Sequence, residues 1–303
     1  MAGLLVLLAA LLAACTTAGP APAPAAPAYE PQRGQPGKDV VWVPTPDAVV
    51  TRMLDMAGVT AADLVVDLGS GDGKIAIAAA RERGARARGL EYNPDLVVLS
   101  RQRAQQAGVA ARVEFLQADI FKSDFCDASV VTMYLLPGLN LRLRETLLRM
   151  KPGTRVVSHS FDMGTWEADE RAYLGNAAVF MWTVPAHVAG LWTVHAPRLP
   201  GAPLTLRLEQ HFQVLAGEAD FGPLSAFLMR PRLDGARIAF TLRDTGGALL
   251  QFDALAAGDR IAGTVQRAGG RAVPFEARRS GPPGAIGGAQ PTAHELRLMG
   301  EPI

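Results

Sequence analysis

The chain has 303 residues and a formal net charge of +1 at pH 7, so it lacks the basic surface typical of nucleic-acid-binding proteins, and we expect no nucleic-acid partner. Its length and its hydrophobic fraction of 49% allow two domains, each with its own core. Its two cysteines, Cys15 and Cys126, are too few for a disulfide framework and lack metal-ligand spacing, so no metal is predicted.

The first 15 residues have the features of a targeting signal. Met1–Ala14 is almost wholly apolar and ends in Leu-Ala-Ala before Cys15, which resembles the lipobox of bacterial lipoproteins. The resemblance implies cleavage before Cys15, a diacylglycerol group on that residue, and membrane attachment in the cell envelope. No Lys or Arg precedes the apolar stretch, so an uncleaved anchor that faces the cytosol is the alternative. Residues 16–38 are rich in Ala and Pro and are predicted to form a disordered tether.

Residues 39–186 are predicted to form an α/β domain. Thr45 and Pro46 fit the N-cap and the first residue of a helix, which Gly58 ends. Strands are then expected at 64–68, 87–92, 112–117, 128–134 and 154–160, with helices at 74–83, 94–108 and 140–150 between them. Alternating strands and helices of these lengths predict a Rossmann-like, doubly wound parallel sheet. The ligand of such a sheet binds at the carboxyl ends of its strands.

The first predicted strand leads into an unusual turn. Residues 65–73 are Val-Val-Asp-Leu-Gly-Ser-Gly-Asp-Gly, a buried strand that ends in an acid and is followed by glycine at every second position. Glycines let the backbone adopt positive φ and approach a ligand closely, and the next helix offers free N–H groups. The spacing G-x-G-x-G differs from the dinucleotide fingerprint G-x-G-x-x-G, and no phosphate-binding G-K-[ST] follows. The pattern therefore predicts a cofactor loop of another type.

This turn resembles motif I of the class I methyltransferases that use S-adenosylmethionine (SAM). The resemblance implies that Asp67 accepts from the amino group of SAM, that Glu91 binds the ribose hydroxyls, and that Asp119 binds the adenine amino group. Each acid taken alone fits an exposed carboxylate at a strand end. A dehydrogenase also places an acid where Glu91 stands, but the glycine spacing and Asp119 favour SAM. The predicted cofactor-binding residues are Thr45, Asp67, Gly69, Gly71, Gly73, Glu91 and Asp119.

The resemblance extends to a narrower family over about Val41 to Asp169. The segments that carry it are 42–46 (Trp-Val-Pro-Thr-Pro), 67–80, 90–94 (Leu-Glu-Tyr-Asn-Pro), Ser100-Arg101, 153–158 (Gly-Thr-Arg-Val-Val-Ser) and Trp166. They are similar to the mitochondrial protein-lysine methyltransferases that act on the c-subunit of ATP synthase and on the adenine nucleotide translocase. The resemblance implies methyl transfer from SAM to a lysine ε-amine of a protein substrate.

A lysine acceptor requires an apolar channel, because the amine must be neutral to react. The segment after the fourth strand supplies the predicted channel, and Tyr134 and Asn140 are the predicted catalytic residues that orient the amine. Leu135, Leu136 and Pro137 are expected to line the channel, with His159, Phe161 and Trp166 as its other wall. The alternative for all these residues is ordinary packing at a sheet edge.

Residues 187–303 are predicted to form an all-β accessory domain. Strand-like segments lie at 191–195, 204–215, 224–231, 237–243, 249–255, 260–266 and 272–278, and turns with glycine separate several of them. This pattern predicts an antiparallel barrel or sandwich. A segment at 179–184, alone or together with 191–195, either completes the first sheet or opens the β domain. Residues 280–292 are rich in Gly and Pro and are expected to be loose.

The predicted signal and the predicted cofactor point to different compartments. SAM is a cytosolic metabolite, whereas a lipobox directs a chain across the inner membrane. We favour a membrane-attached SAM-dependent methyltransferase, because all three carboxylates that the cofactor needs are present. The alternative is a non-catalytic envelope lipoprotein that uses the methyltransferase fold and the β domain as a binding or scaffolding module.

Overall fold

The computed structural model describes residues 29–197, 204–222, 224–288 and 292–299, and the described residues from Pro31 onward form one compact unit. The predicted signal, with Cys15 and most of the predicted tether, lies outside the described residues. No helix in the described part of the chain has the length and hydropathy needed to cross a membrane.

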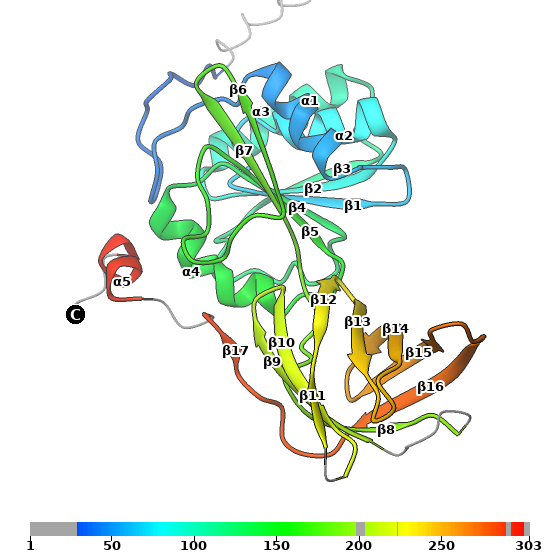
Figure 1. The fold of residues 1–303 in the computed structure, drawn as a ribbon. Coiled ribbons are helices and arrows are strands. Elements are labelled where there is room, and N and C mark those ends of the chain that lie inside the picture. Colours follow the sequence, from blue (N-terminus) through cyan, green and yellow to red (C-terminus); the bar gives the residue numbers. More distant parts are fainter. Residues whose placement is uncertain (1–28, 198–203, 223, 289–291, 300–303) are drawn as a thin grey trace, which may run out of the picture. The chain divides into compact units, whose positions relative to one another are not determined.

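A seven-stranded sheet forms the first half of the fold (Figure 1). Its strands are β1 (Leu64–Leu68), β2 (Arg86–Glu91), β3 (Val113–Gln117), β4 (Val130–Met133), β5 (Arg155–His159), β6 (Glu170–Leu174) and β7 (Ala177–Thr183). They lie in the order β3-β2-β1-β4-β5-β7-β6. The first five strands are parallel, while β7 runs antiparallel to β5 and β6 antiparallel to β7. The predicted doubly wound sheet is therefore confirmed.

Helices cover both faces of this sheet, as Figure 1 shows. The four helices are α1 (Asp47–Met56), α2 (Lys74–Arg83), α3 (Pro94–Gln106) and α4 (Pro137–Leu148). Successive strand residues point to opposite faces. In β1, Val65 packs into the core under α1, α2 and α3, and Val66 packs into the core under α4. The strand order changes direction between β1 and β4, which is where a ligand crevice opens in folds of this type.

An antiparallel sheet follows and nearly closes into a barrel, so the barrel alternative is the right one (Figure 1). Its nine principal strands are β8 (Gly190–His195), β9 (Leu204–His211), β10 (Val214–Asp220), β11 (Ser225–Phe227), β12 (Met229–Asp234), β13 (Arg237–Arg243), β14 (Leu249–Ala257), β15 (Arg260–Arg267) and β16 (Ala272–Arg279). Strand β16 pairs with β8, and the consecutive strands β11 and β12 pair with β10 and β13 respectively. Buried aliphatic and aromatic side chains, including Trp192 and Phe252, fill the interior. A short strand, β17 (Ile286–Gly287), adds to β9 in parallel.

Several elements differ from the sequence prediction. The segment 204–215 is not one strand, because a turn at Phe212 and Gln213 divides it into β9 and β10. No glycine marks that turn, and Phe212 itself has a φ of +52°. Strand β6 and a short helix, α5 (Ala293–Met299), were not predicted. Of the two ambiguous segments, the one at 179–184 forms most of β7 in the first sheet, whereas 191–195 belongs to the barrel.

Candidate active site

The glycine turn after β1 has the backbone conformation that its sequence predicts. Gly69, Gly71 and Gly73 have φ values of +74°, +55° and +82°, which favour glycine. A Cβ atom at Gly73 would lie 2.6 Å from the ring of Phe115. Helix α2 begins at the next residue, so its free N–H groups face the turn. Gly69 and Gly71 line the pocket, whereas Gly73 does not, and a side chain there would collide with the core ring of Phe115.

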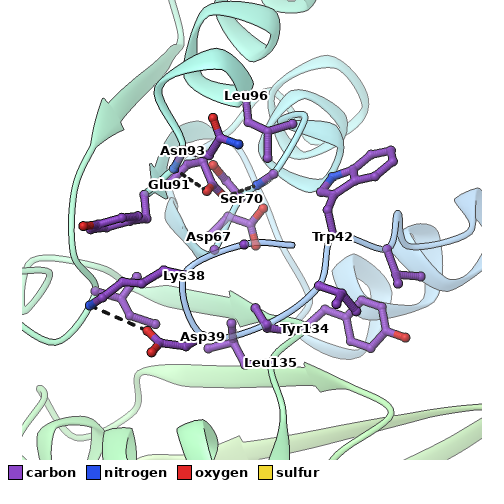
Figure 2. Close-up of a pocket in the computed structure, with 18 of the residues that line it drawn as sticks. Lys38, Asp39, Trp42, Asp67, Ser70, Glu91, Asn93, Leu96, Tyr134 and Leu135 are labelled. Carbon is purple, nitrogen blue, oxygen red and sulfur yellow. Dashed lines mark hydrogen bonds and ion pairs between the residues drawn. The ribbon is translucent and has the colours of Figure 1, made fainter. Parts of the chain in front are cut away.

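The three predicted carboxylates lie at the carboxyl ends of adjacent strands and line one pocket. Figure 2 shows two of them, Asp67 and Glu91. Asp67 accepts a hydrogen bond from the Thr132 hydroxyl at 2.7 Å. Glu91 accepts from the backbone N–H of Gly71 at 2.9 Å and of Asn93 at 2.8 Å. The link from Gly71 to Glu91 connects the glycine turn directly to the end of β2.

Asp119, the third carboxylate, is already paired in this structure. It accepts from the backbone N–H of Phe121 at 3.0 Å and from Nζ of Lys38 at 2.9 Å. The hydrogen bond from Lys38 is the main reason why the pKa of Asp119 lies below its usual value. The adenine-binding acid predicted from the sequence therefore carries a lysine partner that the sequence did not predict.

Asp67 has the most perturbed environment of the three. It is 2% exposed, and burial raises its pKa to about 7, with a further contribution from the nearby carboxylates of Asp72 and Glu91. Asp72 is itself paired with Arg103. A buried carboxylate with no cation of its own favours a positively charged ligand.

The chemical groups of the pocket fit SAM. The hydroxyl oxygen of Ser70 is buried in the turn and has no partner, so it can bond a ligand there. The buried Asp67 carboxylate suits the positive charge of SAM, and the glycine turn offers backbone N–H groups. Among the described residues, no group of three or more His, Cys, Asp and Glu side chains could hold a metal ion.

Residues 34–45 form a strap at the pocket, and residues 35–45 of it line the pocket together with Asp67; Figure 2 labels Lys38, Asp39 and Trp42 of the strap. The backbone N–H of Gly34 donates to the carbonyl of Trp42 at 2.8 Å, and the N–H of Trp42 donates to Gln35 at 3.0 Å. The indole of Trp42 lies so close to the turn that a Cβ atom at Gly71 would be 2.8 Å from its Nε1 atom. The strap includes residues 34–38, which were predicted to belong to the tether.

The acceptor side of the same pocket is apolar and aromatic. Its lining residues are Thr45, Tyr134, Leu135, Leu136, Leu139 and Phe161. His159 packs behind it: its ring centroid lies 3.9 Å from that of Tyr134, and its Nδ1 atom lies 3.2 Å from the hydroxyl oxygen of Thr45. Burial lowers the pKa of His159 to about 4, so the imidazole is neutral near pH 7.

The structure corrects the predicted role of Thr45 in α1. The helix begins at Asp47 with Pro46 at the N-cap, and no side chain caps it. The Thr45 hydroxyl contacts His159 instead, because the strap turns this side chain toward the end of β5. The N-cap assignment was therefore wrong by one residue, while Thr45 does line the predicted pocket.

Asn140 is fully buried in the first turn of α4 and is not among the lining residues. Its Nδ2 group donates to the carbonyls of Phe161 and Asp162, both at 3.1 Å, and to the Ser158 hydroxyl at 3.2 Å. Its Oδ1 atom is buried without a partner. Asn140 thus holds the segment after β5, and it retains one free acceptor.

Comparison with known proteins identifies the family. Residues 67–170 match the ANTKMT methyltransferase domain. The chain is 38% identical over 154 residues to a protein-lysine N-methyltransferase of Saccharolobus islandicus, and the match covers 96% of that protein and 49% of this chain. The chain belongs to the protein-lysine N-methyltransferase family. The predicted relationship is confirmed, and the cofactor is SAM.

The matches to other known proteins cover different shares of their length. This methyltransferase is 38% identical over 128 residues to the mouse adenine nucleotide translocase lysine N-methyltransferase, which covers 55% of that protein and 42% of this chain. A match to the mouse lysine N-methyltransferase of the ATP synthase C-subunit covers 49% of that protein, so the chain spans about half of each mouse relative. A solved RNA methyltransferase from Salinibacter ruber, bound to S-adenosyl-L-homocysteine, is 52% identical, has a TM-score of 0.48, and is matched over 96% of its length and 48% of this chain.

Proposed function

We propose that this protein transfers a methyl group from SAM to the ε-amine of a lysine in a protein substrate. The observation that carries the proposal is one pocket with two unlike ends, three carboxylates at one end and an apolar, aromatic wall at the other, in a chain of the protein-lysine methyltransferase family. SAM supplies a methyl group on a positively charged sulfur, which needs only a neutral nitrogen in line with it. The protein therefore has to align the amine and exclude water.

On the cofactor side, each acid has a part of SAM to bind. Glu91 would accept from the ribose hydroxyls, and Asp119 from the adenine amino group once Lys38 releases it. Asp67 would accept from the amino group of the methionine portion. The N–H groups of the glycine turn and the hydroxyl of Ser70 remain for its carboxylate.

On the acceptor side, the lining residues keep the lysine amine neutral. The six side chains of this wall carry no carboxylate that could stabilise an ammonium ion, and an apolar environment favours the uncharged amine. The neutral His159 adds no charge, and with a pKa of about 4 it is too weak a base to hold the proton, which passes to solvent. Tyr134 in the wall is the group we propose to orient the amine, whereas Asn140, buried outside the lining, holds the segment after β5 in place.

The test is transfer of tritium from methyl-labelled SAM by the full-length protein to proteins of a cell extract, followed by acid hydrolysis and detection of methyl-lysine. Glu91→Ala should abolish the labelling. Label found in RNA and not in lysine would contradict the proposal, and so would a folded protein that binds SAM but labels neither. That last outcome would favour the binding or scaffolding alternative.

We also propose that the protein is attached to the cell envelope through a lipid on Cys15. The support is the sequence of residues 1–15 alone. Radiolabelled palmitate should label the wild type and not Cys15→Ala. A reporter fused after Ile303 that is active only in the cytosol would contradict export and favour the cytosol-facing anchor.

A further inference from the structure

The segment between β5 and β6, residues 160–169, forms the far part of the acceptor side, and we name it the acceptor loop. It opens at Ser160, which has a φ of +66°, and its second residue, Phe161, lines the pocket. Helix α4 holds the first half of the loop from within the sheet domain. Asn140 donates to two of its carbonyls, and Nη1 of Arg144 donates to the carbonyl of Met163 at 3.0 Å.

The barrel holds the second half of the same loop through the turn between β9 and β10. The ring of Phe212 stacks on Trp166, with centroids 5.6 Å apart and an interplanar angle of 10°. Nε1 of Trp166 donates to Oε1 of Gln213 at 3.0 Å. Nε2 of Gln213 donates to the carbonyl of Glu167 at 2.8 Å and to the carboxylate of Asp169 at 2.9 Å. Three hydrogen bonds and one stack therefore connect a two-residue turn to a single loop.

The backbone at this contact is strained on both sides. Among the described residues other than glycine, only Ser160, Phe212 and Arg230 have positive φ, and two of these three lie at the acceptor loop and at the turn that holds it. Such conformations persist where the surrounding contacts over-determine them. Phe212 is 1% exposed, and its carbonyl accepts from the buried amide of Gln210 at 2.7 Å. The hydrogen bond from Gln210 thus fixes the conformation of the turn within the barrel, independently of the contacts that the turn makes with the acceptor loop.

The contact cannot act on the cofactor directly. No lining residue of the pocket comes from the described part of the barrel, since the last lining residue in the chain is Phe161. The turn contacts the acceptor loop and also Arg144 of α4, whose guanidinium lies 5.6 Å from the ring of Phe212, so the barrel can influence the site through these two elements of the acceptor side. The barrel should therefore affect the acceptor side of the pocket and leave the glycine turn unchanged.

We propose that Phe212 and Gln213 are positioning residues for the acceptor: they fix the acceptor loop, and hence Phe161, in the geometry that binds the substrate lysine. This assignment rests on the proposed lysine methyltransferase activity. It gives the barrel a defined role in catalysis that does not require it to touch the substrate. Weakening the turn should then raise KM for the lysine substrate and leave the affinity for SAM unchanged.

The test compares Gln213→Ala with Val214→Ala in the full-length protein. Gln213 is only half-buried, so its alanine variant should fold, and Val214 is an exposed neighbour on the same hairpin that serves as the control. With poly-L-lysine as the acceptor probe, Gln213→Ala should raise KM about ten-fold, the effect of losing one or two net hydrogen bonds. The Kd for SAM, measured by calorimetry, should stay within about two-fold of the wild type in both variants.

A second measurement does not depend on methylation. Amide hydrogen exchange in residues 161–169 should be about ten-fold faster in Gln213→Ala, with no change in residues 69–73. An unchanged KM with only a lower melting temperature would overturn the proposal, as would unchanged exchange or a parallel loss of SAM affinity. If the wild type methylates no lysine at all, the proposed function fails while the exchange experiment still tests the positioning contact.

Discussion

The two sides of the pocket differ in how far along the chain their supports come from. On the cofactor side, Gly71 bonds Glu91 only 20 residues away, and the turn is built from consecutive residues. On the acceptor side, Thr45 contacts His159 114 residues later, and Glu295 reaches Thr165 across 130 residues. The cofactor side is thus built mainly from residues within the family match at 67–170, apart from the strap, whereas the acceptor side depends on Thr45 and Glu295, which lie outside that range.

The largest effect should come from the most distant support of the acceptor side. Arg144 and Glu295 form an ion pair at 2.6 Å, and both side chains are almost completely buried. Although burial alone would raise it, hydrogen bonds from Arg144 and from the backbone of Thr165 and Thr292 hold the pKa of Glu295 at about 2. Arg144→Ala should lower the free energy of unfolding by about 3 kcal/mol in urea denaturation, because it leaves a buried carboxylate unpaired.

The double variant Arg144→Met, Glu295→Leu is the matched control, since it removes both charges and should recover most of the lost stability.

The ion pair of Arg144 and Glu295 also makes the stability of the protein depend on pH. Because the pKa of Glu295 is lowered on folding, its contribution is present above about pH 4.5 and is lost as the pH falls toward 2. Arg144→Ala should leave the affinity for SAM unchanged. A loss of SAM affinity as large as the loss of stability would show that the cofactor side depends on the supports of the acceptor side, and would contradict the comparison of the two sides.

The same difference explains what the sequence could and could not predict. The strand, glycine turn and helix at 64–83 are encoded in adjacent residues, so hydrophobic pattern and turn chemistry were enough to place them and the carboxylates Asp67 and Glu91. Parallel pairing then brings Asp119 to the same edge of the sheet without further information. These predictions needed only short-range rules.

The remote contacts that complete the site have no local signal in the sequence. The turn at Phe212 and Gln213 lacks glycine, proline and asparagine, so 204–215 looked like one strand. Helix α5 does carry a local signal, the capping box in which Thr292 and Glu295 bond each other's backbone N–H, but its contact with Arg144, 151 residues earlier, has none. Lys38 reaches Asp119 across 81 residues. Such contacts depend on how distant segments pack in the folded protein, and the hydrophobic periodicity of a single sequence does not encode that packing.

On the cofactor side, Glu91→Ala should have the largest effect on SAM binding. Loss of a charged hydrogen-bond acceptor for the ribose should cost about 2–3 kcal/mol, or tens- to a hundred-fold in the Kd measured by calorimetry. The variant also frees the N–H groups of Gly71 and Asn93, so part of the loss reflects a looser turn. Asp95→Asn, an exposed neighbour at the start of α3, is the control and should bind normally. If Glu91→Ala instead raised the KM for the lysine substrate ten-fold and left the Kd for SAM unchanged, Glu91 would belong to the acceptor side and the assignment would be wrong.

The pKa of Asp67 gives the cofactor side a pH response of its own. Because burial raises this pKa to about 7, the protonated form predominates below pH 7 and must lose its proton to bind a cation. SAM affinity should therefore fall by up to about ten-fold for each pH unit below 7, and Asp67→Asn should bind weakly but without this dependence. The stability of the ligand-free protein should change in the opposite sense, decreasing as the pH rises from about 4 through 7. Calorimetry and thermal melts between pH 5 and 8 test both signs.

The smallest expected effect concerns Lys38, one of the strap residues that reach the cofactor side. Lys38 of the strap pairs with Asp119 and lies 5.0 Å above the ring of Tyr92, so it competes with the adenine amino group for the carboxylate. The pair is partly exposed and screened by solvent, so Lys38→Ala should strengthen SAM binding only a few-fold at low salt, and less at high salt. Asp39→Ala, on the neighbouring strap residue, is the control. A weaker affinity in Lys38→Ala would mean that the strap lysine assists binding, and that the cofactor side also depends on the segment before residue 67.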